Sequence, residues 1–149
     1  MGVASARARS TNSLSVVRIE RALLDEIVAH AVRDAPNECC GLVLGRGGTA
    51  TSARALENLA ASPFRFDIDG RELIGFAFAD EDEDQLTAIY HSHTRSAPYP
   101  SQTDVNFAAG WPGVEWLIVG VPKAKDTEPD VRSYLIEGGA IREVELEVT

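Results

Sequence analysis

Cysteine is scarce in this chain of 149 residues: it has only two, Cys39 and Cys40, and they are neighbours. Adjacent cysteines cannot form an ordinary disulfide framework within one chain, because a disulfide needs a backbone separation and orientation that neighbours do not provide. The sequence therefore excludes a disulfide-rich secreted scaffold. A reducing cytoplasm is the expected location.

Long apolar runs are also lacking. No segment approaches the roughly 18 consecutive apolar residues that a membrane-spanning helix needs, so no membrane association is predicted. Basic residues are few as well, with 14 lysines and arginines against 23 aspartates and glutamates and a formal net charge of -9. A surface of this sign repels polyanions, which excludes nucleic acid as an expected partner.

The chain does contain enough apolar sequence for one folded unit. Its hydrophobic content of 44% is that of a globular protein, and 149 residues suit a single core. Residues 1–14 carry arginines and small polar residues but no apolar segment that could serve as a secretory signal. We expect a disordered tail at residues 1–14 and a single domain at residues 15–149.

The spacing of apolar residues predicts a mixed arrangement of helices and strands. Helical spacing and capping residues predict helices at residues 21–35, 69–79 (capped by Asp69) and 101–109. Continuous or alternating apolar runs predict strands at residues 16–19, 38–45, 51–58, 86–93 and 116–121, and a terminal hairpin of 131–138 with 140–148 around Gly138 and Gly139. Because hairpins and crossovers are mixed, we expect an α/β or α+β fold with one mixed sheet.

The segment YHSHTRSAPYPSQTD, residues 90–104, concentrates side chains that bind metals. His91 and His93 are two residues apart on a predicted strand, so they point to the same face with α-carbons roughly 6.5 Å apart. Both imidazoles can therefore reach one cation. Asp104, near the start of the next helix, is a candidate third ligand. Two histidines and one carboxylate leave a fourth tetrahedral position for water, as in catalytic zinc sites.

Each half of this pattern also has an ordinary explanation. A His-x-His pair alone is weak evidence, and Ser-x-x-Asp is a common helix cap. The combination, joined by a short loop with Pro98 and Pro100, favours the metal site. Ser101 can serve in both ways, because a capping oxygen accepts an N–H and leaves the hydroxyl proton free to donate to an oxyanion. The same three ligands would also suit a non-heme iron enzyme.

Hydrolysis of an amide by metal-activated water needs a group that moves a proton to the leaving amine. Glu38 is the candidate, because it begins a predicted buried strand, where a charged residue is unusual unless it has a function. The alternative explanation is a glutamate at a strand end that points to solvent.

Glu38, His91-Ser92-His93, seven residues, Ser101, two residues and Asp104 match the JAMM motif, E…H-S/T-H-x7-S-x2-D. Together with PNECCGLVLG and LENLAASPFRFDID, this motif makes residues 19–136 resemble the MPN-plus metallopeptidases, in particular their short bacterial members. The resemblance implies a cytidine-deaminase-like α-β-α domain and zinc-dependent hydrolysis of a peptide or isopeptide bond. His91, His93 and Asp104 would bind one Zn²⁺ with a water, Glu38 would be the general acid/base, and Ser101 would steady the tetrahedral intermediate.

The resemblance also implies a class of partner. Short bacterial members of the family remove cysteine or a processing tail from ubiquitin-like sulfur-carrier proteins, so a carrier ending in Gly-Gly and a role in cysteine biosynthesis are expected. Tyr99, between two prolines beside the site, is a candidate to line the groove for that tail. A non-catalytic MPN scaffold is the alternative, although such scaffolds typically lose ligands that this chain keeps. The identity of the carrier and of the leaving group stays open, and a homodimer is compatible with the sequence.

The remaining conspicuous residues are expected to be structural. Cys39 and Cys40 should pack as small apolar groups, while an influence of either on the metal stays open. His30 is expected to be packed or solvated, and Trp111, Trp116 and Phe107 to belong to the core. The acidic run at residues 80–84 is expected to be a solvated loop, with steering of a basic carrier as its alternative role.

Overall fold

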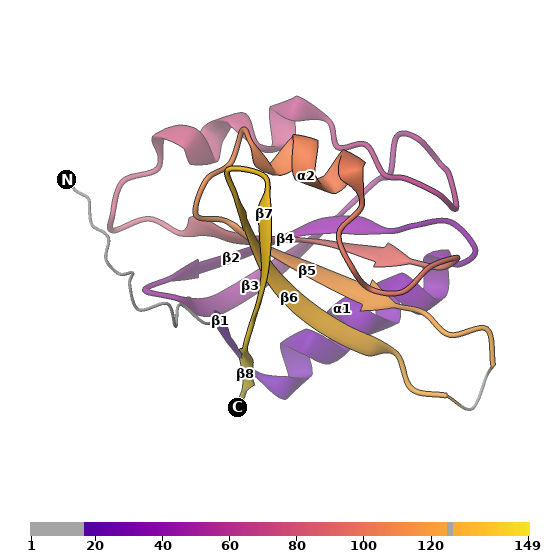
Figure 1. The fold of residues 1–149 in the computed structure, drawn as a ribbon. Helices are drawn as coiled ribbons and strands as arrows, with labels where there is room; N and C mark the ends of the chain where they lie inside the picture. The colour runs from indigo at the N-terminus through magenta and orange to yellow at the C-terminus, as the bar shows by residue number, and fades with distance from the viewer. Residues whose placement is uncertain (1–16, 125–126) are drawn as a thin grey trace.

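The computed structural model describes residues 17–124 and 127–149, which form an eight-stranded sheet with helices on both faces (Figure 1). The predicted tail at residues 1–14 lies outside the described residues. The helices are α1 (Arg21–Asp34) and α2 (Gln102–Ala108), with two 3-10 helices, η2 (Gly70–Glu72) and η3 (Ile74–Phe78). The strands are β1 (Val17–Ile19), β2 (Cys40–Arg46), β3 (Thr49–Leu56), β4 (Gln85–His93), β5 (Glu115–Gly120), β6 (Asp130–Glu137), β7 (Ala140–Val144) and β8 (Leu146–Val148).

The sheet is mixed, as the sequence predicts, with the strand order β7-β6-β5-β4-β2-β3-β1-β8. β4 and β5 are parallel neighbours, and α2 lies in the connection between them. On its other side β4 pairs in antiparallel fashion with β2, and Cys40 lies opposite His91. The beginning of β2 therefore meets the end of β4, which brings Glu38 beside the two histidines.

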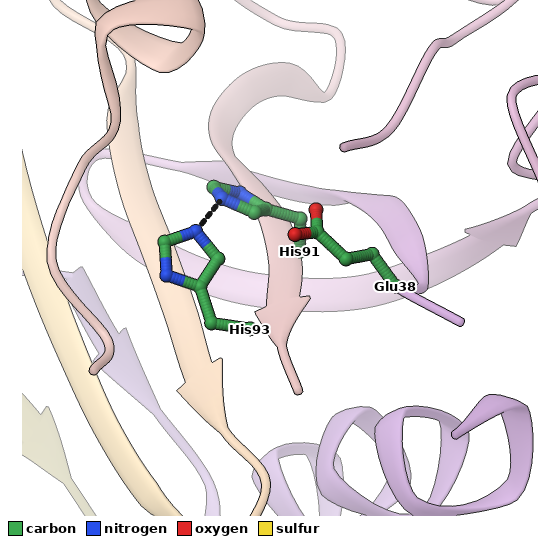
Figure 2. A group of neighbouring side chains, drawn as sticks. All are labelled: Glu38, His91 and His93. Carbon is green, nitrogen blue, oxygen red and sulfur yellow. Dashed lines mark hydrogen bonds between the residues drawn. The ribbon is translucent and has the colours of Figure 1, made fainter. Parts of the chain in front are cut away.

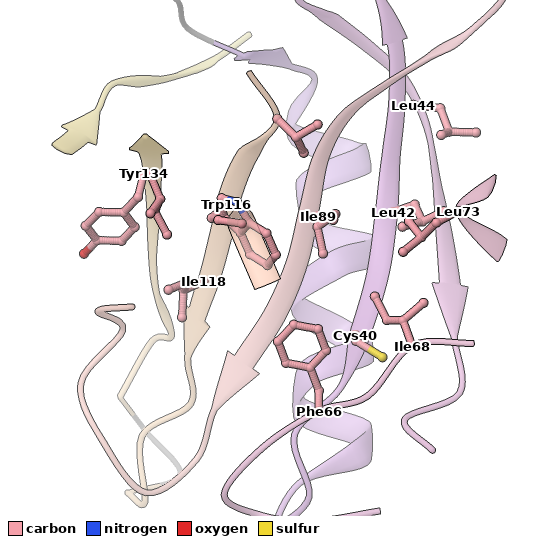
Figure 3. Packing of buried hydrophobic residues seen from close by; sticks show 13 residues of the cluster. Cys40, Leu42, Leu44, Phe66, Ile68, Leu73, Ile89, Trp116, Ile118 and Tyr134 are labelled. Atoms are coloured by element: carbon pink, nitrogen blue, oxygen red, sulfur yellow. The ribbon is translucent and has the colours of Figure 1, made fainter. Parts of the chain in front are cut away.

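Two apolar clusters lie on the two faces of the sheet. α1 covers one face, and α2 and the 3-10 helices lie over the other (Figure 1). Figure 3 shows the second cluster, with Trp116 and Ile89 on the strands and α1 behind them. Side chains alternate between the faces along β4, so Tyr90 packs on the α1 side while Ile89 faces α2. No helix in the described part of the chain is long and apolar enough to span a membrane.

The helix predicted at residues 69–79 is wrong in type. Asp69 caps it as predicted, accepting the Arg71 N–H over 3.0 Å, but the backbone then forms two short 3-10 helices joined at Leu73. Only Leu73 is buried, whereas Ile74 and Phe78 are 63% and 79% exposed. A long amphipathic helix needs a whole stripe of apolar residues to pack against the sheet, and this segment has only the buried Leu73 and the partly buried Phe76.

The predicted terminal hairpin is right in its first half only. β6 and β7 pair around Gly138 and Gly139, whose positive φ angles of 58° and 80° suit glycine. Beyond Glu145, however, β8 leaves this pair and lies parallel to β1 at the other edge of the sheet. Because neighbouring strands lie about 4.8 Å apart, a single residue cannot cross a flat sheet of eight strands. The sheet therefore curls until its two edges approach each other.

Candidate metal centre

The two histidines of β4 converge on one point. His91 and His93 are both buried, at 0% and 4% exposure, and their Nε2 atoms lie 3.1 Å apart (Figure 2). They share a face because alternate residues of a strand point to the same side. This is the placement that the spacing of the two residues predicts.

Asp104 joins them from the start of α2. Ser101 is the N-cap of this helix: its Oγ accepts the Asp104 N–H over 3.2 Å, while its own N–H donates to Asp104 Oδ2 over 2.9 Å. The reciprocal pair of bonds fixes the carboxylate against the helix terminus. Asp104 Oδ2 then lies 3.2 Å from His91 Nε2 and 3.6 Å from His93 Nε2.

These three atoms fit a tetrahedral zinc ion. The donors of such an ion lie about 2.0–2.2 Å from the metal, which places neighbouring donors roughly 3.3–3.6 Å from each other. The triangle of His91 Nε2, His93 Nε2 and Asp104 Oδ2 has edges of 3.1, 3.2 and 3.6 Å. Two imidazole nitrogens and one carboxylate oxygen are also the donor types that zinc takes in open sites.

Contacts around His93 set its tautomer. Its Nδ1–H donates to the carbonyl oxygen of Ala97 over 2.7 Å, which leaves the lone pair of Nε2 free to bind a metal. The same carbonyl accepts the Tyr99 N–H over 2.8 Å. Pro98 lies close against Gly120, where a side chain would meet the proline ring. The loop that follows the histidines is thus held against the end of β5.

Phe66 orients the other histidine. Its ring stacks on that of His91 with centroids 4.5 Å apart and planes inclined by 27°. Trp116 contributes an edge contact to the same imidazole, with centroids 6.3 Å apart. Sequence reasoning missed Phe66 as a residue of the site, although it lies in the FRFDID stretch of the family resemblance. No local signal could have found it, because the contact joins an irregular segment to a strand.

Glu38 is buried beside the histidines rather than exposed at a strand end. It lies two residues before β2 and is 5% exposed, and one of its carboxylate oxygens is within 4.8 Å of both imidazoles (Figure 2). Its N–H donates to Ser62 O and its C=O accepts the Asn58 Nδ2–H, each over 2.9 Å. The alternative that Glu38 points to solvent is therefore wrong.

Burial and neighbouring charges shift the pKa values of this cluster in different directions. Burial raises the pKa of Glu38 to about 7, against the effect of His93, while the Asp104 charge adds to the rise. Burial lowers the pKa of His91. For Asp104, burial favours the neutral form, but the hydrogen bonds of His91 and His93 outweigh it and hold the pKa well below its usual range. The ionised Asp104 beside the neutral imidazole of His91 suits metal binding.

The chain matches over residues 20–137 the family described as prokaryotic homologs of the JAB domain. It belongs to this family. Over 131 residues it is 37% identical to a CysO-cysteine peptidase of Mycobacterium tuberculosis, covering 86% of this chain and 88% of the relative. Over 102 residues it is 37% identical to a desampylase of Haloferax volcanii, covering 63% of this chain and 73% of the relative. These relatives are named as a peptidase and a desampylase, and this chain is a hydrolase of the JAMM type.

The fold agrees with this membership. A JAB1/MPN domain protein from Archaeoglobus fulgidus superposes with a TM-score of 0.60 over 91% of this chain and 99% of that chain, at 22% identity. At this identity the likeness shows a shared fold. The α-β-α arrangement expected from the JAMM motif is therefore confirmed.

The other conspicuous residues pack as expected. Cys39 and Cys40 are free and buried on opposite faces of the sheet, and burial raises the pKa of both thiols to about 12, so they stay protonated. His30 is a buried residue of α1, and its Nδ1 lies 2.6 Å from the Tyr90 hydroxyl while its Nε2 lies 3.1 Å from Asp34. Trp116 is fully buried, with Phe107 and Trp111 partly buried against the same cluster.

Proposed function

We propose that this JAB-family chain is a zinc-dependent peptidase that hydrolyses the amide bond after the C-terminal glycine of a ubiquitin-like or sulfur-carrier protein. The observation that carries the proposal is the triangle of three buried donor atoms with edges of 3.1, 3.2 and 3.6 Å, with a buried carboxylate at its side. The names of the relatives, a CysO-cysteine peptidase and a desampylase, support the choice of substrate class.

His91, His93 and Asp104 would hold the ion. A bound Zn²⁺ would polarise the substrate carbonyl and lower the pKa of a water to about 7. The chain supplies the rest of the environment. Ala97 fixes the tautomer of His93, Phe66 fixes the ring of His91, and the Ser101 N–H holds the carboxylate of Asp104.

Glu38 would move the proton. It takes a proton from the attacking water, whose oxygen bonds to the carbonyl carbon, and gives that proton to the nitrogen as the C–N bond breaks. The products are the carrier's free carboxylate and an amine. One carboxylate oxygen of Glu38 lies within 4.8 Å of a nitrogen of each imidazole, so it is close enough to reach a water held between them. A pKa raised by burial suits a group that both accepts and donates near neutral pH.

Ser101 would stabilise the oxyanion. Its Oγ accepts the Asp104 N–H, so its hydroxyl proton is free to donate to the oxygen that gains charge when the carbonyl is attacked. The residue thereby combines the two roles considered from the sequence, that of helix cap and that of donor to the reaction.

Tyr99 would line the groove for the carrier's tail. Its side chain is 54% exposed, and its ring stands edge-on to Tyr134 at a centroid distance of 5.6 Å. Tyr134 is anchored in turn by its hydroxyl, which donates to Pro98 O over 2.7 Å. An exposed ring that is fixed by packing against Tyr134 suits contact with a narrow Gly-Gly tail. Tyr99→Ala should raise KM for the carrier, and an unchanged KM and cleavage rate would remove this role.

The decisive experiment is incubation of the zinc-loaded protein with carrier proteins that end in Gly-Gly plus an extension, followed by intact mass. Loss of the extension with a free glycine carboxylate is the expected result. Carriers recovered at their original mass, under conditions in which the protein holds one zinc, would contradict the proposed function.

A reducing cytoplasm suits this protein, because its two thiols, Cys39 and Cys40, are unpaired.

A further inference from the structure

A pocket of about 400 Å³ opens next to the proposed metal centre. It is lined by residues 35–36, 94–95 and 121–123. Its volume lies in the range of sites that bind small molecules or single side chains. None of these residues belongs to the JAMM motif, and the reaction described above uses none of them.

Each wall of this pocket continues an element of the metal centre. Pro36 lies two residues before Glu38, and Arg95 lies two residues after His93, so the α-carbons of the latter pair are at most about 7.6 Å apart. The third wall begins at Val121, whose N–H donates to His93 O over 3.0 Å. Thr94 holds the first two walls together, because its hydroxyl donates to Pro36 O over 2.7 Å. The pocket is therefore a neighbour of the reacting atoms.

The pocket is positively charged in a chain whose formal net charge is -9. Among the residues that the structure describes, Arg95 and Lys123 are the charged side chains that line it, and no described carboxylate does. In the described part of the chain neither residue forms an ion pair, so both charges are available. The Arg95 guanidinium lies 5.6 Å from the centroid of the Phe64 ring, a contact that steadies it without neutralising it. The complementary ligand is an anion, and an arginine fork suits a carboxylate.

The proposed substrate offers one anion at this place. The glycines before the scissile bond are uncharged, whereas an amino acid joined through its α-amine carries a free carboxylate two bonds from the scissile nitrogen. A lysine joined through its ε-amine carries none nearby. We propose that Arg95 and Lys123 bind the α-carboxylate of the leaving group, which makes the chain selective for a single C-terminal amino acid over an isopeptide. This inference rests on the proposed function.

The kinetic test uses one carrier with three tails: Gly-Gly-Cys with a free carboxylate, the same tail with a C-terminal carboxamide, and Gly-Gly joined to a lysine ε-amine. Wild type should cleave the acid with a kcat/KM about 10-fold or more above that of the amide and the isopeptide. The double variant R95Q/K123Q should lose this preference and cleave the amide as wild type does. Arg46→Gln is the matched control, because it removes an exposed positive charge at the other end of β2.

Equal cleavage of acid and amide by wild type would overturn the inference. So would an equal loss on both tails in the double variant, which would mean that the pocket contacts the body of the carrier. If wild type cleaves no tail, the proposed function fails, and a binding experiment still decides the role of the pocket. S-methyl-L-cysteine, whose thioether replaces the metal-binding thiol, should bind wild type in titration calorimetry more tightly than its amide does. Undiminished binding to the double variant would refute the carboxylate site.

Discussion

Ser101 and Asp104 are hydrogen-bonded to each other in both directions, over 3.2 Å from Asp104 N to Ser101 Oγ and over 2.9 Å from Ser101 N to Asp104 Oδ2. The oxygen that accepts the second bond is the one that faces His91 and His93. The start of α2 and the third candidate ligand therefore form one unit. A change at Ser101 affects the helix cap and the chemistry together, and the two effects need to be separated.

Two variants of Ser101 separate them. Replacing a capping serine by alanine costs about 0.5–2 kcal/mol of stability, whereas glycine costs only a few tenths. Both variants lack the hydroxyl, so both should lower kcat by about 100-fold if it stabilises the oxyanion. Ser101→Gly should thus stay close to wild type in its free energy of unfolding while losing activity like Ser101→Ala. Urea denaturation and steady-state kinetics measure the two quantities, and near-wild-type kcat in the glycine variant would contradict the role.

Zinc should stabilise the folded chain. A ligand that binds only the folded state adds about 2.7 kcal/mol at 100 times its Kd, which for a chain of this size corresponds to several degrees in Tm. Asp104→Ala should lose most of this shift, and Asp82→Ala, in the exposed acidic run, should keep it. Thermal denaturation with and without zinc measures the effect.

Iron in the purified protein, with turnover that depends on dioxygen, would instead favour the alternative of a non-heme iron enzyme.

Glu38→Gln should keep the metal and lose the reaction. The amide has nearly the shape of the carboxylate but cannot accept the proton of water, so we expect a rate lowered by about 10²–10⁴-fold with an unchanged zinc content. Glu57→Gln, an exposed change nearby, is the control and should cleave like wild type. Metal analysis and intact mass provide the two measurements. Cleavage by the Glu38 variant at the wild-type rate would disprove the mechanism.

Glu115 is a buried acid on the α1 side of the sheet, away from the proposed reaction. It is 5% exposed and accepts the Ser133 hydroxyl over 2.8 Å and the N–H of Val17. Burial raises its pKa to about 7, although these hydrogen bonds oppose the rise. Its bonds join β5, β6 and β1, which the curled sheet brings together.

The raised pKa of Glu115 predicts how stability depends on pH. Between about pH 4.5 and 7 the unfolded chain has released this proton while the folded chain still holds it, so stability falls as pH rises through this window. The fall amounts to on the order of 3 kcal/mol for a difference of about 2.5 pKa units. In Glu115→Gln this contribution should be absent, whereas the similar contribution of Glu38 remains in both proteins. The free energy of unfolding of the variant should therefore rise relative to that of wild type by about this amount across the window. Urea denaturation of both proteins across this range gives the difference, and parallel curves would contradict it; Glu81→Gln, an exposed change, should follow wild type.

The two wrong predictions concern segments whose local pattern is ambiguous. Residues 69–79 have helical spacing, yet only Leu73 is buried, and without a packed stripe the segment forms 3-10 turns. Residues 140–148 alternate like one strand, yet the sheet closes on itself and gives β7 and β8 different partners. Both outcomes depend on neighbours far away in the chain, which a local pattern does not contain.

The sequence by itself determined the candidate donor set, because two histidines at strand spacing and an aspartate in the first turn of a capped helix are local patterns with fixed geometry. Tertiary structure alone decided what surrounds them. The antiparallel pairing of β2 with β4 buried Glu38, and Phe66 came to stack on His91. The segments that follow β4 and β5 brought the positively charged side chains of Arg95 and Lys123 to one pocket. These contacts join segments distant in sequence, and they exist only once apolar burial has fixed the register and curvature of the sheet.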